Sequence, residues 1–219
     1  MKGIANLCPW FPFSPPTPTG KVLEHLRSAL PPWDRAVVLA DLYAANATMI
    51  TRGLSAEQLK DELLPAVYLR NLPAPAGYFD YASTHALGLM FSVLAIGTLF
   101  DSELGPFHAE ADGYIDLATA ALGLQSVFDR PSFLTVQCLL VTYTFYNMRG
   151  GDIMDSDTAM EAVWSLITMA AQVSEIVSQS CLDFDLNLTT FSSRSVYVGI
   201  PFHLGMVRYL TTSRSRSQP

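Results

Sequence analysis

Apolar residues recur at intervals of three and four along most of the chain, which is the spacing of one face of an α-helix. The stripes lie within residues 20–30, 32–50, 107–124, 131–148 and 158–177. Alternation with a period of two, which would indicate strands, is not sustained before residue 186. The pattern therefore predicts an all-α fold, a multi-helix bundle or array of antiparallel helices of about 12–20 residues with an irregular C-terminal tail.

The residues of each stripe are the ones that we expect to be buried inside the protein. They are Val22, Leu23, Leu26 and Leu30; Leu39, Leu42, Tyr43, Asn46 and Ile50; Tyr114, Leu117, Ala118, Ala121 and Leu122; Leu134, Cys138, Val141 and Phe145; and Trp164, Ile167 and Ala171 with Val163 beside them. Prolines and glycines separate the helices at Pro31-Pro32, 71–79, Gly105-Pro106, Pro131 and Gly150-Gly151-Asp152.

A short helix is predicted to start near residue 55. Ser55 and Gln58 have the spacing of a capping box, and Leu54 with Leu59 has that of a hydrophobic staple. Pro65 is expected to end or kink this helix, because proline lacks the backbone N–H and its ring collides with the preceding turn.

Residues 81–100 form an apolar run without a charged side chain, and Asp80 and Asp101 close it on either side. About 20 residues are enough to cross a bilayer as a helix, so a membrane span and a buried core helix are both open. Small and polar residues share one narrow stripe of the run: His85, Gly88, Ser92 and Ala95. This stripe and the acidic flanks favour a core helix that a neighbour approaches closely. His85 is expected to be a capping or hydrogen-bonded core histidine.

Composition predicts a large core and argues against nucleic-acid binding. Of the 219 residues, 50% are hydrophobic and 15% are charged, against about 25% charged in a typical soluble domain. The net charge is −7; residues 21–177 carry 8 Lys and Arg against 18 Asp and Glu, or −10, and residues 178–219 carry 4 against 2, or +2. An acidic body repels phosphate, so direct contact with DNA or RNA is not expected.

The sequence holds no motif for catalysis: no Gly-rich phosphate loop, nucleophile elbow or zinc-protease pattern. His108, Asp112 and Asp116 share one helical face and have the chemistry of metal ligands. Tyr114 and Leu117 fall on the opposite side, so a solvated face is expected instead. The other polar candidates are His25, His203, Gly150-Gly151-Asp152, Asp155 and Asp157. We expect no enzyme, no cofactor and no catalytic, metal or DNA-binding residue.

Cys8, Cys138 and Cys181 follow no zinc or disulfide spacing and are expected to be free thiols. The start of the chain does not predict a signal peptide, so the glycosylation sequons at Asn46 and Asn187 are expected to be chance matches. Residues 9–18 contain five prolines. This proline content favours a linker. Pro12, Pro15 and Pro18 have P-x-x-P spacing, so a docking motif is the alternative.

Three segments carry a family pattern: HALGLMFSVLAIGTLFD (His85 to Asp101), YIDLATAAL (Tyr114 to Leu122) and PSFLTVQCLLVTYTFYNM (Pro131 to Met148). They resemble the fungal-specific transcription factor domain, the middle homology region of fungal zinc binuclear cluster activators. In that family an H-A-L helix ends in G-x-L-F-D, and Y-x-x-A-R-A-A-L and P-S-[IL]-x-T-V-Q-A-L-L elements follow. Thr135-Val136-Gln137 is the most specific match, and the resemblance covers roughly residues 21–177.

Two departures limit what the resemblance implies. Relatives bind DNA through six cysteines that share two zinc ions, and three scattered cysteines cannot build that cluster. Zinc and DNA binding are therefore implied for the relatives. After Val177 the family's G-L-H-R-D element is replaced by Ser178-Gln179-Ser180-Cys181. Since Val-Ser is what a common fungal intron start encodes, we expect residues 178–219 to be intron read-through and a shifted frame.

The sequence thus predicts three parts. Residues 1–20 are expected to be a disordered Pro-rich linker, 21–177 the N-terminal part of the regulatory domain, and 178–219 a disordered or aberrant tail. The resemblance implies a truncated nuclear transcription regulator that acts through protein partners, a dimer among them, and contacts no membrane. Two alternatives stay open: an integral membrane protein with two or three spans, and a helical-repeat scaffold of the tetratricopeptide kind.

Overall fold

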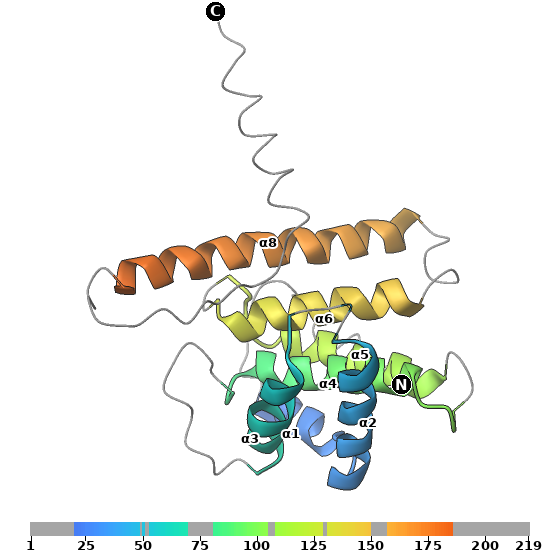
Figure 1. The fold of residues 1–219 in the computed structure, drawn as a ribbon. Coiled ribbons are helices and arrows are strands. Elements are labelled where there is room, and N and C mark those ends of the chain that lie inside the picture. Colours follow the sequence, from blue (N-terminus) through green and yellow to red (C-terminus); the bar gives the residue numbers. More distant parts are fainter. Residues whose placement is uncertain are drawn as a thin grey trace, which may run out of the picture.

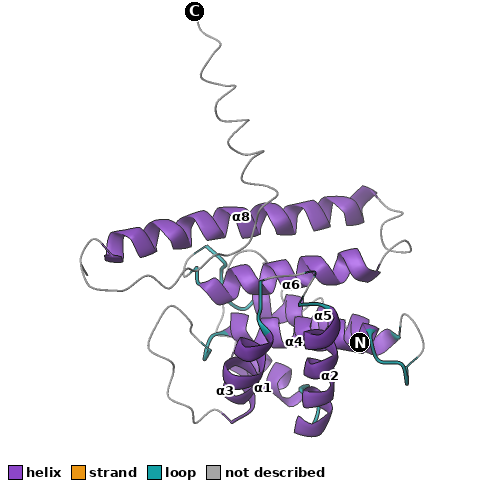
Figure 2. Ribbon diagram, in the orientation of Figure 1, coloured by secondary structure: helices purple, strands orange, loops and turns teal. Residues whose placement is uncertain are grey.

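The computed structural model describes residues 20–48, 50, 53–69, 81–104, 108–128, 131–149 and 157–185, with side chains in the last range described for 163–178. The elements are α1 (Gly20–Ser28), α2 (Trp33–Asn46), the π-helical segment η2 (Gln58–Leu63), α3 (Leu64–Leu69), α4 (Thr84–Leu99), α5 (Ala109–Leu122), α6 (Phe133–Arg149) and α8 (Asp157–Asp185). The described ranges contain helices and loops without a strand (Figure 2), so the predicted all-α class is confirmed.

Several predicted features lie outside the described residues. They are the Pro-rich start with its P-x-x-P spacing, the 71–79 connector, Gly105-Pro106, Gly150-Gly151-Asp152, Asp155, His203, Asn187 and residues 186–219.

The helices are arranged around α4 (Figure 1). α4 contacts α2, α5 and α6, and α8 lies along α6 as the outermost layer. α1, η2 and α3 lie on the side of the molecule away from α8. Burial of α4 from several directions explains why its sequence is apolar all round.

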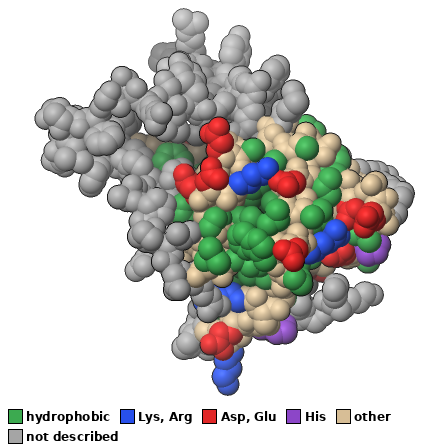
Figure 3. Space-filling view, turned by 60° about the horizontal axis from the view of Figure 1, so that its bottom comes forward, with side chains coloured by type: hydrophobic (Ala, Val, Ile, Leu, Met, Phe, Trp, Pro, Cys, Tyr) green, Lys and Arg blue, Asp and Glu red, His purple; other side chains and the backbone are tan. Residues whose placement is uncertain are grey.

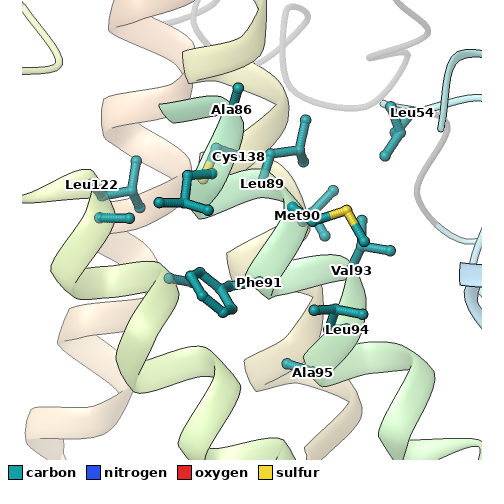
Figure 4. Packing of buried hydrophobic residues seen from close by; sticks show 14 of the residues in the cluster. Leu54, Ala86, Leu89, Met90, Phe91, Val93, Leu94, Ala95, Leu122 and Cys138 are labelled. Atoms are coloured by element: carbon teal, nitrogen blue, oxygen red, sulfur yellow. The ribbon is translucent and has the colours of Figure 1, made fainter. Parts of the chain in front are cut away.

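The central helix α4 buries every residue from His85 to Thr98. Its first turn is capped by Ser83, whose Oγ accepts the N–H of Ala86 at 3.2 Å. Its side chains leave in several directions: Phe91 stacks on Tyr114 of α5 with ring centroids 6.3 Å apart, and Met90 points to another side (Figure 4). Of the helices that the structure describes, none combines the length and hydropathy of a membrane span.

Glycines set the closest approaches to α4. A Cβ added to Gly88 would lie 3.2 Å from Cys138 Sγ and 3.3 Å from the Ala118 carbonyl oxygen, so α5 and α6 both approach this position. The predicted close approach along this stripe is therefore confirmed. Gly97 was not predicted as part of the stripe, yet a Cβ there would overlap the Leu39 carbonyl of α2. The crossing of α2 and α4 requires glycine at this point.

The predicted inner stripes of the middle helices are largely confirmed. Every residue expected inside 107–124 and 131–148 is buried. In α2 the prediction extended too far: Asn46 is exposed, Ile50 is 66% exposed, and the helix ends at Asn46. Leu39 and Tyr43 are buried as predicted, and the buried face of α2 also contains Ala36 and Ala40, whose small side chains permit the close crossing with α4.

The short helix begins as predicted but continues past its proline. Ser55 Oγ accepts the N–H of Gln58 at 3.0 Å, and Leu54 and Leu59 are both buried. The chain passes from η2 into α3 and reaches Leu69, so of the two outcomes expected at Pro65, an end or a kink, the end is wrong. Proline cannot donate the α-helical bond, and the wider winding just before it absorbs that loss.

The predicted inner stripe of α8 is wrong except for Val163. Trp164 is 56% exposed, Ala171 is exposed and Ile167 is half-buried. The buried stripe consists of Val163, Leu166, Ala170, Val173 and Val177. Packing on α6 selects the side of the helix with the larger number of apolar residues. The predicted domain boundary at residues 177 and 178 falls inside α8, which runs to Asp185.

One buried hydroxyl lacks a partner, and this leads to a testable expectation. Tyr43 is fully buried, and its Oη has no hydrogen-bond partner among the described residues. Tyr43→Phe is expected to leave stability unchanged or raise it by about 1 kcal/mol, since it removes an uncompensated desolvation cost. Urea unfolding measures the change. Tyr81→Phe is the matched control and should destabilise, because Tyr81 Oη donates to Glu62. Equal losses in both variants would contradict the expectation.

Candidate protein-contact face

The acidic and histidine residues of α5 do not form a metal site. His108 is the N-cap of α5, and its Nδ1 accepts the N–H of Glu110 at 3.3 Å. Asp112 accepts two bonds from Arg149, from Nε and Nη2, each at 2.9 Å. Within the residues described, no group of three His, Cys, Asp or Glu side chains is placed to hold a metal ion. The predicted solvated face holds for His108, which is exposed, and for Asp112, whose side chain is 43% exposed, whereas Asp116 is half-buried. Burial, with the neighbouring Asp112 charge, raises the pKa of Asp116.

The buried polar residues between the helices have structural roles. His85 lies between Thr135 Oγ1, 2.8 Å from its Nδ1, and the Gln125 carbonyl, 3.1 Å from its Nε2, so the expected core histidine is confirmed. Burial raises the pKa of Cys138 to about 12, so its thiol stays protonated at neutral pH and is a poor nucleophile. His25, by contrast, is exposed on α1.

A second polar group ties α6 to the short helix. The side-chain amides of Gln58 and Gln137 donate to each other at 3.1 and 2.8 Å, and Gln137 Nε2 also donates to the Gly53 carbonyl at 2.6 Å. Gln58 therefore does not complete the predicted capping box with its side chain. Gln137 belongs to the most specific segment of the family resemblance, and its observed role is to position residues 53–58.

A charged group joins α2 to the ends of α4 and α5. Arg35 contacts Asp101 at 2.6 Å and Glu110 at 3.5 Å, and Tyr114 Oη donates to Glu110 at 3.0 Å. The hydrogen bond from Arg35, with that from the Glu103 N–H, holds the pKa of Asp101 below its ordinary value. Asp101 and Glu110 thus both contact Arg35, and Glu110 also accepts from Tyr114. The group has a structural role, because it holds α2 to the ends of α4 and α5.

Replacing Asp101 is expected to change the acid dependence of stability. Its pKa is lower in the folded protein, so the unfolded chain binds more protons and stability falls as the pH drops below about 4. Asp101→Asn should lower stability at neutral pH and make the fall of stability below about pH 4 less steep. Urea unfolding at stepped pH measures both effects. Asp41→Asn removes the exposed pair with Lys60 and serves as control; an equally reduced fall of stability there would contradict the prediction.

Two sides of the molecule expose large apolar side chains. The α2–α3 face contains Trp33, Val38 and Leu69, which are 40%, 50% and 56% exposed. Viewed from that side, hydrophobic side chains gather in the middle with acidic and basic ones around them (Figure 3). The Trp33 ring already packs edge-on against Tyr68 at 5.4 Å, and Tyr68 Oη donates to the Pro31 carbonyl at 2.8 Å. Trp33, on this face, is therefore already partly covered by Tyr68 of the same chain.

The outer face of α8, turned away from α6, is different in character. It consists of Trp164, Ser165, Thr168, Ala171, Gln172, Glu175, Ile176 and Ser178. Glu175 is the one charged residue between positions 163 and 178. Trp164 is 56% exposed and Ile176 is 37% exposed. A solvated helix face usually carries several charges, so a nearly uncharged face with an exposed tryptophan is typical of a protein-contact surface.

Hydroxyl groups along α8 bond to the helix's own backbone. Thr168 Oγ1 donates to the Trp164 carbonyl at 2.8 Å, Ser174 Oγ to the Ala171 carbonyl at 2.8 Å and Ser178 Oγ to the Ser174 carbonyl at 2.7 Å. A buried donor is costly only when it has no acceptor. A partner can therefore cover this face without leaving these hydroxyl protons unsatisfied.

Sequence periodicity identified Trp164, Ile167 and Ala171 as one stripe but assigned that stripe to the interior. The missing signal was the second stripe on the same helix, which carries more apolar residues and packs on α6.

No known protein family, curated protein or solved structure matches this chain.

Proposed function

We propose that this chain is a non-enzymatic regulatory module of transcription, resembling the fungal-specific transcription factor domain. It acts in the nucleus through protein contacts and without a DNA-binding cluster or cofactor of its own. The observation that carries the proposal is the outer face of α8, which is nearly uncharged and presents an exposed Trp164. A contact surface is the feature that a regulator without its own DNA-reading module needs.

The transcription role rests on the resemblance, and the segments that carry it are neighbours in the fold. The three segments with the family pattern form these three helices, and they meet where Gly88, Ala118 and Cys138 approach one another. The His85 bond to Thr135 joins the H-A-L element to the T-V-Q element. The resemblance is thus carried by residues that contact each other in the fold.

A tethering assay tests this function. The chain is fused to a heterologous DNA-binding domain in yeast, and transcription of a reporter is compared with that from the DNA-binding domain alone. We expect a change of several-fold, lost in Trp164→Lys and retained in Val38→Lys, which alters an exposed apolar residue on α2. A fluorescent fusion too large to diffuse should accumulate in the nucleus. An unchanged reporter at equal protein levels would overturn the proposal.

A further inference from the structure

We propose that the outer face of α8 binds the same face of a second copy of this chain, with the two α8 helices antiparallel. The inference rests on the proposed function, because it names the partner of the face on which that function depends. α8 is the outermost helix and packs mainly on α6 (Figure 1). On its other side Trp164 is 56% exposed, and Ala171 and Glu175 are also exposed.

Charge favours a second copy as the occupant. The chain is acidic, with a net charge of −7, so most surfaces of two copies repel each other. The outer face of α8 is the exception, since Glu175 is its one charged residue. Two copies that meet here bring few like charges together. A basic partner would instead be drawn to the acidic surfaces elsewhere on the chain.

Shape also favours self-association. The largest residue of the face, Trp164, lies toward its N-terminal end, and the small residues Ala171 and Ser178 lie at its middle and toward its C-terminal end. Trp164 and Ser178 are equally far from Ala171 along the helix. A two-fold axis at Ala171 therefore places each Trp164 opposite the small Ser178 of the other copy and the two Ala171 residues opposite each other, which is the self-complementarity that an isologous interface needs.

The position of Glu175 selects the antiparallel orientation. In a parallel pair in register the two Glu175 carboxylates would lie side by side, at a cost in repulsion. In the antiparallel pair each Glu175 lies on the same side of the axis as Trp164 of the other copy. The indole N–H is a donor, and a carboxylate is its natural acceptor.

The contact spans one helix face of about 24 Å, given 1.5 Å per residue over positions 163–178. This is small beside the roughly 1,200–2,000 Å² that stable interfaces bury, so a micromolar, concentration-dependent dimer is expected. It should strengthen with salt, because screening weakens the repulsion between two acidic chains.

Sedimentation equilibrium of the full chain tests the proposal, at concentrations between about 1 and 200 µM. The apparent mass should rise from 24.0 kDa toward twice that value. Trp164→Lys should weaken the dimer by about 30-fold or more, as for an interface hot spot. Val38→Lys, an equivalent change on α2, should leave it unchanged. Since Trp164 is largely exposed, both variants should fold, which circular dichroism and urea unfolding verify.

Cross-linking tests the orientation. In a chain with Cys8→Ser and Cys181→Ser, Ala171→Cys should form a disulfide-linked dimer across the axis under mild oxidation, whereas Val38→Cys should not. A monomer over the whole concentration range would overturn the proposal, as would a dimer that survives Trp164→Lys, fails to cross-link at position 171 or weakens with salt. If the chain is monomeric while the reporter still responds to Trp164→Lys, the dimer is wrong and the proposed function stands with another partner.

Discussion

Gly97→Ala is expected to destabilise the fold by about 2 kcal/mol or more. A Cβ at this position would overlap the Leu39 carbonyl and lie 2.9 Å from its carbon and 3.1 Å from Leu39 Cα. These are backbone atoms of α2, which move only if the whole helix moves, and such overpacking costs about 1–3 kcal/mol or more. Alanine gains about 1 kcal/mol over glycine in helix propensity, too little to offset a backbone clash of this kind. Urea unfolding of both proteins measures the difference.

Two other glycines provide matched controls. Gly20→Ala at the start of α1 has no atom within 4 Å of the added Cβ, so it should be neutral or stabilise by up to about 1 kcal/mol. Gly88→Ala has its nearest contacts at 3.2 and 3.3 Å, and its effect should fall between the other two. The three variants should rank in that order. A Gly97→Ala protein as stable as the Gly20→Ala protein would show that α2 and α4 do not cross as closely as described.

Local periodicity was enough to predict the fold class and most of the central core. In α5 and α6 the stripes led by Tyr114 and Leu134 are buried as expected. These helices are packed from several sides, so any apolar residue on them finds a neighbour. For such helices an error in choosing the buried side has little consequence.

The outermost helix was harder, because α8 has apolar residues on two sides and packs on one helix. Its sequence offers Trp164 with Ile167 and Ala171, and also Leu166 with Val173, as interior stripes. The shape of α6 decides between them, and that shape depends on residues far away in the sequence. Gly97 escaped prediction for the same reason, since its need for a missing Cβ comes from Leu39 on another helix.

The resemblance and the contact face therefore rest on different parts of the chain. The family pattern lies in α4, α5 and α6, where His85, Thr135 and Gln137 make hydrogen bonds that hold the domain together. The proposed contact face lies on α8, supported from below by α6. Loss of the buried polar bonds should therefore weaken the helices on which α8 lies.

His85→Leu is expected to destabilise the protein by about 2–4 kcal/mol. The Gln125 carbonyl can only accept, so His85 Nε2 carries the proton and Nδ1 accepts from Thr135 Oγ1. Leucine would remove the bonds to the buried Thr135 hydroxyl and the part-buried Gln125 carbonyl, at about 1–3 kcal/mol each, and its own apolar burial offsets part of that loss. Thr135 Oγ1 also accepts the N–H of Ser132 at the start of α6, so the change disturbs that helix end. Urea unfolding measures the loss.

His25→Leu makes the same chemical change at an exposed position of α1 and should alter stability by no more than about 0.5 kcal/mol. Thr135→Val removes the other partner of the buried bond. If the bond between His85 and Thr135 contributes as argued, the double variant should lose about 1 kcal/mol less than the sum of the two single losses, because a hydroxyl that is absent cannot be left unsatisfied. Strictly additive losses would mean that the two side chains stabilise the fold independently, and the joining of α4 to α6 would then depend on apolar packing and on the Ser92–Thr142 hydrogen bond.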